Sequence, residues 1–386
     1  MIPAVLTSTG KLIGLDRAGL RQRLGELVTR AFQVDQIYDA IYLRGITDFA
    51  AMTNLSLALR RELSDRFSFG LPVIASQQAS ADGTTKFLLR LDDGASIETV
   101  DIPETSRRTL CISSQAGCGL ACAFCVTGYW GAGRNLSAGE IVGQVMLVRQ
   151  IQNLPESLNL VFMGMGEPLL NLNGVHTALQ LLSERISWRR MTVSTAGVIP
   201  GIDAIGAWDR RPNLAVSLHA PDDARRSEIM PINRTYPLPD LLDALRRFPL
   251  ESRRRITIEY ILLAGFNDRP ADAIALAQLL RKLPVKVNLI PFNADPVLGE
   301  RFARPDDAVV DRFQETLIAR HLTATVRRTR GEDVGAACGQ LRAFARPPRA
   351  QLVKPAHPHK PSQPIKPIKP IKPIKPMTPG NASQGS

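Results

Sequence analysis

The sequence is poor in the features that mark membrane and secreted proteins. Its 386 residues contain no run of about 18 apolar residues, so we expect no membrane-spanning helix. The stretch Met1–Val5 is not a basic region followed by an apolar core, so we expect no secretory signal. Only five cysteines are present, and four lie between residues 111 and 125, which does not fit an extracellular disulfide framework. These absences predict a cytoplasmic protein without a membrane partner.

Acidic residues are missing from the C-terminal end of the chain. Residues 346–386 carry eight Lys and Arg but no Asp or Glu, whereas the rest is nearly balanced, with 40 basic and 36 acidic residues. Pro-Ile-Lys repeats four times from Pro364, a spacing typical of polyproline II, and such a segment cannot bury a core. We therefore expect a disordered basic tail over 346–386. It could bind RNA phosphates, but a solubilising appendage is the simpler interpretation.

The rest of the chain changes its hydrophobic period along its length. Residues 1–70 are expected to form a helical accessory domain, and residues 71–108 a small β linker segment with strands at 86–91 and 95–100. From residue 109 to 345, apolar strand segments alternate with helical ones. This alternation predicts a parallel α/β core, as an open sheet or a partial barrel, with its active site at the C-terminal ends of the strands. The expected core strands are 109–113, 158–163, 191–194, 214–218, 255–263, 286–290 and 323–329.

Three cysteines form a C-x3-C-x2-C motif, Cys118, Cys122 and Cys125, in a loop rich in small residues. Iron–sulfur clusters held by protein alone usually take four cysteines, so a cluster held by three has one iron open to a reactant. Two other interpretations stay open at this point. The cysteines could belong to a structural zinc site, with the distant His219 as the fourth ligand, or they could be ordinary buried thiols.

Polar residues directly follow several of the expected strands. In Gly164-Met165-Gly166-Glu167-Pro168 the glycines let the backbone approach a ligand, and Glu167 offers an acceptor for an ammonium group. Hydrogen-bonding side chains also stand at the ends of three later strands, at Ser194, at Ser217 and His219 on either side of Leu218, and at Asn293. Each alone is explained as a loop cap or a satisfied core group, but together they can line one cavity.

Two cysteines lie outside the motif, Cys111 and Cys338. Cys338 stands in a stretch rich in Gly and Ala, which suits a mobile reactive thiol, although a lone cysteine is more often a small buried hydrophobe. Two cysteines of this kind permit transient disulfide chemistry.

Residues 11–342 resemble the RlmN/Cfr group of radical S-adenosylmethionine (SAM) RNA methyltransferases, most closely its RlmN branch. The resemblance rests on segments 97–103, 109–125, 134–136, 164–171, 193–200, 217–221 and 329–341. It implies a partial (β/α)6 barrel with an N-terminal helical module and a small β extension. The radical SAM core would span 109–345, including a C-terminal catalytic-cysteine loop. It also implies a [4Fe–4S] cluster held by Cys118, Cys122 and Cys125. The implied SAM contacts are Gly166, Glu167, Ser194, Ser217, Leu218, His219 and Asn293.

The resemblance further implies methylation of C2 of an adenine in 23S rRNA, and of tRNA. Cys338 would receive a methyl group from one SAM, and a radical made from a second SAM would activate that methyl for addition to C2. Glu98 matches the family's proton acceptor, and Cys111 would attack Cys338 to release the product through a disulfide. An electron donor such as flavodoxin or ferredoxin is implied, and we expect a monomer.

Two rival functions stay open. One is Cfr-like methylation of C8 of the same adenine, and the other is a non-catalytic RNA-binding protein with a structural zinc. The sequence also departs from the family pattern. Gln33 and Asp35 stand where basic residues are common, and Ala132 replaces an aromatic residue. The first departure puts RNA contacts from that helix in doubt, but neither touches the implied chemistry.

Overall fold

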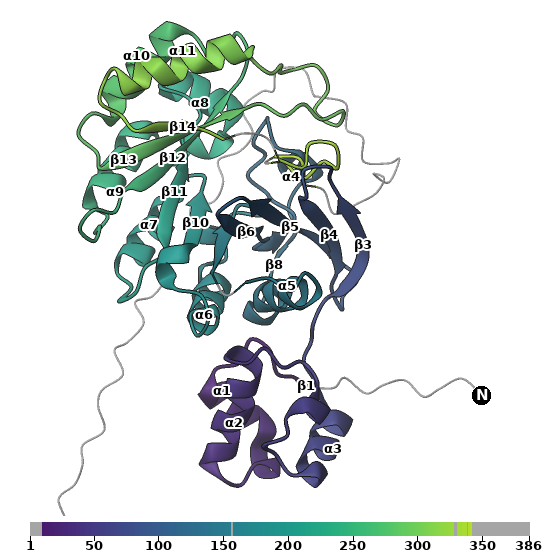
Figure 1. The fold of residues 1–386 in the computed structure, drawn as a ribbon. Coiled ribbons are helices and arrows are strands. Elements are labelled where there is room, and N and C mark those ends of the chain that lie inside the picture. The colour runs from purple at the N-terminus through teal and green to yellow at the C-terminus, as the bar shows by residue number, and fades with distance from the viewer. Residues whose placement is uncertain (1–9, 156, 328–329, 338, 342–386) are drawn as a thin grey trace, which may run out of the picture. The chain divides into compact units, whose positions relative to one another are not determined.

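The computed structural model describes residues 10–155, 157–327, 330–337 and 339–341 (Figure 1). Cys338 and the expected tail over 346–386 lie outside the described residues. Residues 1–344 form one compact unit. Within it a helical module comes first along the chain, and a long sheet covered by helices follows.

The N-terminal module contains three α-helices, α1 (Arg17–Leu24), α2 (Ala31–Tyr42) and α3 (Leu57–Arg66). The Asp16 carboxylate caps α1 by accepting a hydrogen bond from the Gly19 amide at 2.7 Å, and the Ser56 hydroxyl caps α3. Two short strands, β1 (Gly10–Lys11) and β2 (Phe67–Ser68), pair in parallel and join the two ends of the module. Helices α1 and α3 therefore begin where the sequence offers capping side chains.

The main sheet has ten strands in the order β14-β13-β12-β11-β10-β9-β6-β5-β4-β3. The strands from β6 to β14 in this order run parallel, whereas β3, β4 and β5 are antiparallel to their neighbours. The bounds are β3 (Val73–Ala79), β4 (Thr85–Arg90), β5 (Ser96–Glu104), β6 (Arg107–Cys111), β9 (Leu158–Phe162), β10 (Met191–Thr195), β11 (Asn213–Ser217), β12 (Ile256–Leu262), β13 (Val285–Pro291) and β14 (Ala324–Val326).

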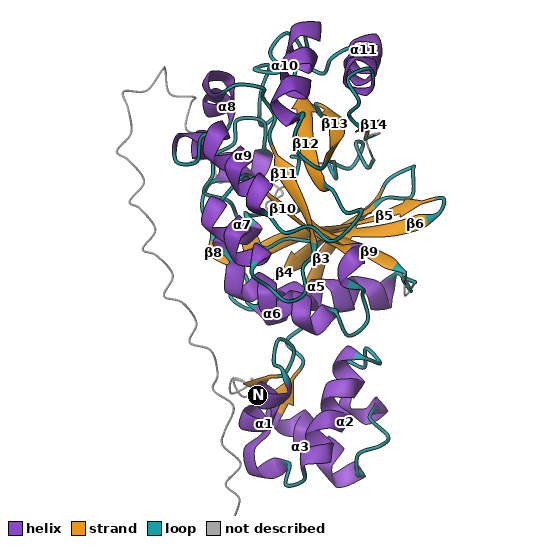
Figure 2. Ribbon diagram, turned by 90° about the vertical axis from the view of Figure 1, so that its left-hand side faces the viewer, coloured by secondary structure: helices purple, strands orange, loops and turns teal. Residues whose placement is uncertain are grey.

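Helices alternate with the parallel strands, and α5, α6, α7 and α9 lie along the outer side of the curved sheet (Figure 2). The sheet ends in two edge strands, β14 and β3, so it forms a partial barrel rather than a closed one. In the part of the chain that the structure describes, no helix has both the length and the apolar character needed to cross a membrane. The helices of this core are α4 (Val126–Trp130), α5 (Ala138–Ile151), α6 (Leu172–Leu182), α7 (Ile199–Gly206), α8 (Asp223–Ile229), α9 (Leu238–Arg247), α10 (Pro270–Leu280) and α11 (Asp307–Ile318).

The α/β fold predicted from the sequence is confirmed, and all seven expected core strands are present within a few residues of their expected bounds. One expectation was incomplete. The β segment before the core does not make a sheet of its own, because β5 pairs with β6 and extends the main sheet by three strands. Strand β3 was not expected, since its residues Val73–Ala79 are mostly exposed and show no alternation of apolar and polar side chains.

Candidate functional site

The cysteine motif lies in a tight loop between β6 and α4, at the C-terminal edge of the parallel strands. The Cys118 amide donates to the Gly131 carbonyl at 2.8 Å, and the Ala123 amide donates to the Ile229 carbonyl at 2.8 Å. Helix α4 begins directly after Cys125. These backbone contacts fix the loop, so the three cysteines are held on one short, folded segment.

The surroundings of these thiols suit ligands of a positively charged group. Burial raises the pKa of Cys118 to about 11 and that of Cys122 well above its ordinary value, and the charge of Cys125 raises both further. A cationic centre would offset this cost by favouring the thiolate forms. Three thiolates on one loop leave one iron of a four-iron cluster open to a reactant, so the donor set fits such a cluster.

His219 does not act as a distant fourth ligand in this arrangement. Its Nδ1 accepts a hydrogen bond from the Ile261 amide at 3.0 Å, and its ring packs edge-on against Phe124, with centroids 4.7 Å apart. Burial lowers its pKa to about 3, so the ring stays neutral. His219 therefore lines a cavity beside the cysteine loop and supplies a wall with a neutral imidazole.

A cavity of about 160 Å³ opens between the cysteine loop and the ends of β9, β10 and β11. Gly166 lies in its wall with φ +100°, and a side chain there would come within 2.5 Å of Gln115, so only glycine fits. The structure brings eight of the predicted site residues together in the lining: Cys118, Cys122, Cys125, Gly166, Glu167, Ser194, Ser217 and His219. Leu218 and Asn293 are buried but are not part of that lining.

Glu167 is the acidic group that the sequence pointed to in this cavity. Its carboxylate accepts hydrogen bonds from the Ala196 amide at 2.7 Å and the Leu169 amide at 3.0 Å. Burial raises its pKa to about 7, against the lowering effect of these two amides. A cationic ammonium group in the cavity would favour the ionised form, so Glu167 is suited to bind one.

Sequence reasoning missed Arg226, which is fully buried and ties the ends of two strands together. Its guanidinium donates to the carbonyls of Ala196 at 2.7 Å, Ser217 at 3.0 Å and Leu218 at 3.1 Å. It also donates to the Asn233 side chain at 2.7 Å. These bonds keep the cavity wall in place. The burial of Arg226 could not be predicted from the sequence, because α8 consists mostly of charged and polar residues and looks like a solvent-exposed helix.

A second group of predicted residues lies on β4, β5 and β6. Glu98 is buried on β5, and Cys111 is buried at the end of β6. The structure adds Lys86 of β4, whose Nζ lies 3.3 Å from the Glu98 carboxylate, and the sequence analysis did not single it out. Cys338 is outside the described residues. Its neighbour Gly339 lines the cavity, and the Gly339 carbonyl accepts from the Val126 amide at 2.7 Å.

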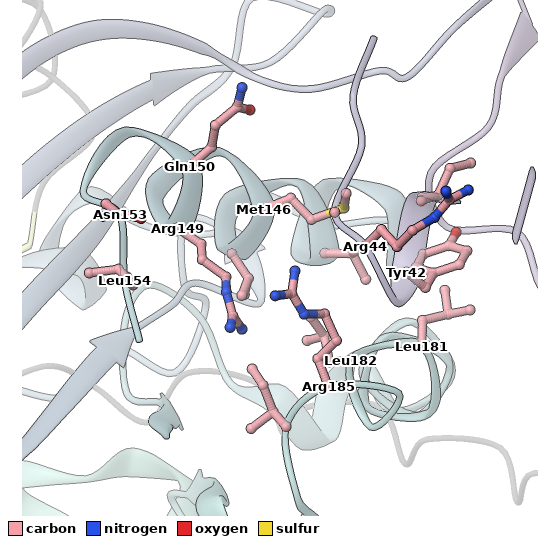
Figure 3. A pocket seen from close by; sticks show the side chains of 15 residues that line it. Tyr42, Arg44, Met146, Arg149, Gln150, Asn153, Leu154, Leu181, Leu182 and Arg185 are labelled. Atoms are coloured by element: carbon pink, nitrogen blue, oxygen red, sulfur yellow. The ribbon is translucent and has the colours of Figure 1, made fainter. Parts of the chain in front are cut away.

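Two further hollows lie away from the cysteine loop. The larger, of about 770 Å³, is inside the sheet's curve and shares Met163 and Glu259 with the first cavity. The other, of about 230 Å³, lies between α2, α5 and α6; Arg149 and Arg185 point toward each other in it, and Arg44 lies at its side near Tyr42 (Figure 3). Its walls come from the C-terminal ends of these helices, so it is not part of the cysteine site.

Comparison with known proteins identifies the family. Residues 112–277 match the model of the radical SAM superfamily, and residues 11–68 match that of the ribosomal RNA large subunit methyltransferase N-terminal domain. The chain is 46% identical over 350 residues to the dual-specificity RNA methyltransferase RlmN of Anaeromyxobacter dehalogenans, covering 88% of this chain and 93% of that protein. It is 50% identical to RlmN of Geobacter sulfurreducens over 315 residues, covering 81% and 86% of the two chains. The chain belongs to the RlmN family.

A solved structure agrees with this assignment. A radical SAM methyltransferase from Sphaerobacter thermophilus is 42% identical and superposes with a TM-score of 0.82, covering 87% of this chain and all of that one. As an RlmN-family member, this protein is an enzyme that methylates RNA and uses a [4Fe–4S] cluster and SAM. The donor set of the cysteine loop and the buried Glu167 fit both groups. The zinc-stabilised, non-catalytic alternative is therefore abandoned.

Proposed function

We propose that this enzyme methylates C2 of a specific adenine in 23S rRNA and also acts on tRNA, through a methyl group carried on Cys338. The observation that carries the proposal is the position of Gly339, the residue after Cys338, in the lining of the cavity beside the cysteine motif. Gly339 lies in one wall of this cavity, and the cysteine motif forms another. The residue that follows the carrier cysteine in the sequence therefore lies beside the site proposed for the reactants. The relatives' names, dual-specificity RNA methyltransferases, support two kinds of RNA substrate.

C2 of adenine is an electron-poor ring carbon, so it does not attack the sulfonium of SAM directly. When bound, the cluster and SAM supply a methyl group and a carbon-centred radical that can activate it. We assign the cluster to Cys118, Cys122 and Cys125. We assign SAM binding to Gly166, Glu167, Ser194, Ser217, Leu218, His219 and Asn293. The backbone turn at Gly166 and the carboxylate of Glu167 orient the amino acid part of SAM.

The remaining residues of the scheme belong to the chain itself. Cys338 carries the methyl group to the adenine, and Glu98 accepts the proton that leaves C2. The thiolate of Cys111 then attacks the sulfur of Cys338 and forms a disulfide between the two cysteines. The electron pair of the broken carbon–sulfur bond stays with the transferred carbon, which takes up a proton and becomes the methyl group. Glu98 and Cys111 lie on adjacent strands, β5 and β6, and both are buried, which suits groups that act on the same bound adenine.

The finer organisation is part of the same proposal. The module over 1–70 and the β segment over 71–108 would help to hold RNA against the core over 109–345. In α2, Asp35 pairs with Arg17 at 3.1 Å, so this position offers no positive charge to RNA. The hollow with Arg44, Arg149 and Arg185 supplies such charge nearby. We further propose a cytoplasmic monomer that takes electrons from a flavodoxin or ferredoxin.

The test is to purify the protein without oxygen, reconstitute the cluster, and supply SAM, a reductant and 23S rRNA or tRNA. Mass spectrometry of the digested RNA should show 2-methyladenosine, and Cys338→Ala should abolish it. Appearance of 8-methyladenosine would instead establish the Cfr-like reaction. SAM cleavage without any RNA product would retain the radical chemistry and refute the substrate assignment.

A further inference from the structure

Lys86 is buried in a part of the sheet where a lysine is costly. Its side chain is only 8% exposed, and that of Glu98 only 4%. Lysine is almost never buried unless its charge is paired, because taking an ammonium group out of water is expensive. The Lys86 Nζ has two acceptors, the Glu98 carboxylate at 3.3 Å and the Gly335 carbonyl at 3.3 Å. It therefore bridges a strand of the sheet and a loop about 250 residues later in the chain.

The register of the strands puts Lys86 on the reacting face. Lys86 pairs with Val100 across β4 and β5, and Val100 pairs with Cys111 across β5 and β6. Opposite residues of an antiparallel pair share a face, and residues two apart on one strand do so as well. Lys86, Glu98 and Cys111 therefore project to the same side of the sheet. The neighbouring strands also place Arg90 of β4 and Arg107 of β6 on this face, but both are exposed, whereas Lys86 and Cys111 are buried.

The loop that Lys86 contacts is the one that carries Cys338, and the turn between β3 and β4 holds it too. The Gly331 amide donates to the Asp82 carboxylate at 3.1 Å, and the Ala81 amide donates to Asp333 at 3.3 Å. On its other side, Gln340 donates to the Ala294 carbonyl at 2.8 Å. Lys86 is the contact of this set that also touches Glu98, so it links the loop to the proposed base.

We propose that Lys86 is a positioning residue for RNA methylation: it keeps Glu98 in its ionised form and anchors, through Gly335, the loop that carries Cys338. The inference rests on the proposed function, because Glu98 must be a base for its ionisation to matter. A buried carboxyl without a partner tends to hold its proton, and a carboxyl that already holds a proton cannot accept one from C2. Lys86 makes no bond to the substrate and adds no chemical step.

The test uses the full chain with a reconstituted cluster and compares Lys86→Met and Lys86→Arg with wild type. Three quantities are measured: S-methylation of Cys338, 5′-deoxyadenosine formed from SAM, and methyladenosine formed in RNA. For Lys86→Met we expect methyladenosine per 5′-deoxyadenosine to fall about tenfold or more, which is less than the roughly 10²–10⁴-fold that a positioned base contributes because Glu98 itself remains. A covalent adduct between Cys338 and RNA should accumulate on a denaturing gel, since the C2 proton is not removed.

Two features of the result separate this role from a purely structural one. Cys338 methylation in Lys86→Met should stay within about threefold of wild type, because Asp82, Val126 and Gln340 still hold the loop. Lys86→Arg should recover most of the methyladenosine formed per 5′-deoxyadenosine, which we call the coupling, since a guanidinium keeps the positive charge beside Glu98. The control is Lys282→Met, which removes an exposed lysine from the end of α10 and should behave as wild type.

Three outcomes would overturn the proposal. The first is unchanged coupling in Lys86→Met. The second is an equal loss of Cys338 methylation, SAM cleavage and RNA product, which indicates a folding role only. The third is a yield of methyladenosine per 5′-deoxyadenosine in Lys86→Arg that is no higher than the yield in folded Lys86→Gln. Lys86→Gln replaces Lys86→Met if Lys86→Met does not fold. Wild-type enzyme that cleaves SAM but yields neither methyladenosine nor adduct would refute the proposed function itself, and the role of Lys86 with it.

Discussion

The two sides of the site are built differently. Around the SAM cavity, polar side chains are held by backbone groups: Glu167 accepts from two amides, and Arg226 donates to three carbonyls. On the side of β4 and β5, two ionisable side chains also pair with each other, Lys86 with Glu98. Backbone contacts resist both mutation and motion, whereas side-chain pairs can open and close. The side of the SAM cavity therefore suits a fixed cofactor, and the side of β4 and β5 suits a cysteine that contacts several partners in turn.

The same division appears in the family matches. The radical SAM superfamily match covers residues 112–277, which include the cysteine motif, Glu167 and Arg226. Glu98, Cys111 and the stretch 331–341 lie outside it, and outside the N-terminal match over 11–68 as well. In the proposed scheme, the part that matches the superfamily holds the cluster and SAM, and the strands and loop outside it carry Glu98, Cys111 and Cys338. Three predictions test this comparison.

The largest effect is expected from Arg226→Met. The change leaves three buried carbonyls without their donor, and breaking such a buried charged network costs about 3–5 kcal/mol. The free energy of unfolding should fall by that amount, and SAM affinity should fall with it, because the carbonyls of Ala196 and Ser217 belong to the cavity wall. Chemical denaturation and SAM titration measure the two effects.

Arg246→Met is the matched control, since Arg246 is exposed on α9 and pairs only with Asp243 nearby. Its effect on stability should stay within about 0.5 kcal/mol. If Arg226→Met were as mild as this control, the cofactor side would not depend on its buried hydrogen bonds, and the contrast between the two sides would fail.

The sequence predicted the cofactor side better than the RNA side for a physical reason. Apolar periodicity marks buried parallel strands, and the polar residues that follow such strands meet at one edge of the sheet. Ser194, Ser217 and His219, which this reasoning singled out, line one cavity. Asn293 came from the same reasoning and Leu218 from the family resemblance, and both lie outside the cavity lining. The sequence does not show the direction of a side chain, so it cannot distinguish a residue that lines the cavity from one that lies next to the lining.

Two important residues could not be predicted from periodicity. Arg226 lies in a helix whose sequence, Asp223–Ile229, is mostly polar, so nothing marks one of its arginines as buried. Lys86 lies in a short strand and finds Glu98 only through the register of β4 with β5. The two strands were expected at 86–91 and 95–100, but the contact of Lys86 with Gly335, 249 residues later, was not. A long-range contact of this kind is a property of the folded chain, and no local pattern records it.

A smaller effect is expected from pH on the cofactor side. The pKa of Glu167 is about 7 when folded, against about 4.5 ordinarily, because the carboxyl is buried. The folded state therefore binds the proton more tightly, and stability falls as pH rises from 4.5 to 7 and levels off above 7. Between pH 5.5 and 8.5 the cluster-free protein should lose about 2 kcal/mol through this group. The same rise in pH should lower the free energy of unfolding of Glu167→Gln by about 2 kcal/mol less than that of wild type, as measured by urea unfolding at both pH values. An equal pH dependence in the two proteins would show that burial does not raise the pKa of Glu167.

The smallest effect on stability is expected from Asp82→Ala on the RNA side. Asp82 accepts from the Thr84 and Gly331 amides, and these hydrogen bonds lower its pKa to about 2 even though the side chain is partly exposed. Losing them should cost no more than about 1 kcal/mol, because solvent can replace the carboxylate. The functional effect should be selective: RNA methylation falls about threefold because the loop carrying Cys338 is less well held, a change in rate that corresponds to roughly 0.7 kcal/mol.

SAM cleavage in the absence of RNA should be unchanged in Asp82→Ala, since the cavity does not include this residue. Asp209→Ala, an exposed aspartate in the turn after α7, is the control and should alter neither rate. The ratio of methyladenosine to 5′-deoxyadenosine, measured in the same reaction, is the deciding quantity. A drop in that ratio for Asp82→Ala alone would show that the two sides can be weakened separately. A parallel drop in SAM cleavage would mean that the loop also shapes the cofactor site, and the two sides would then have to be treated as one.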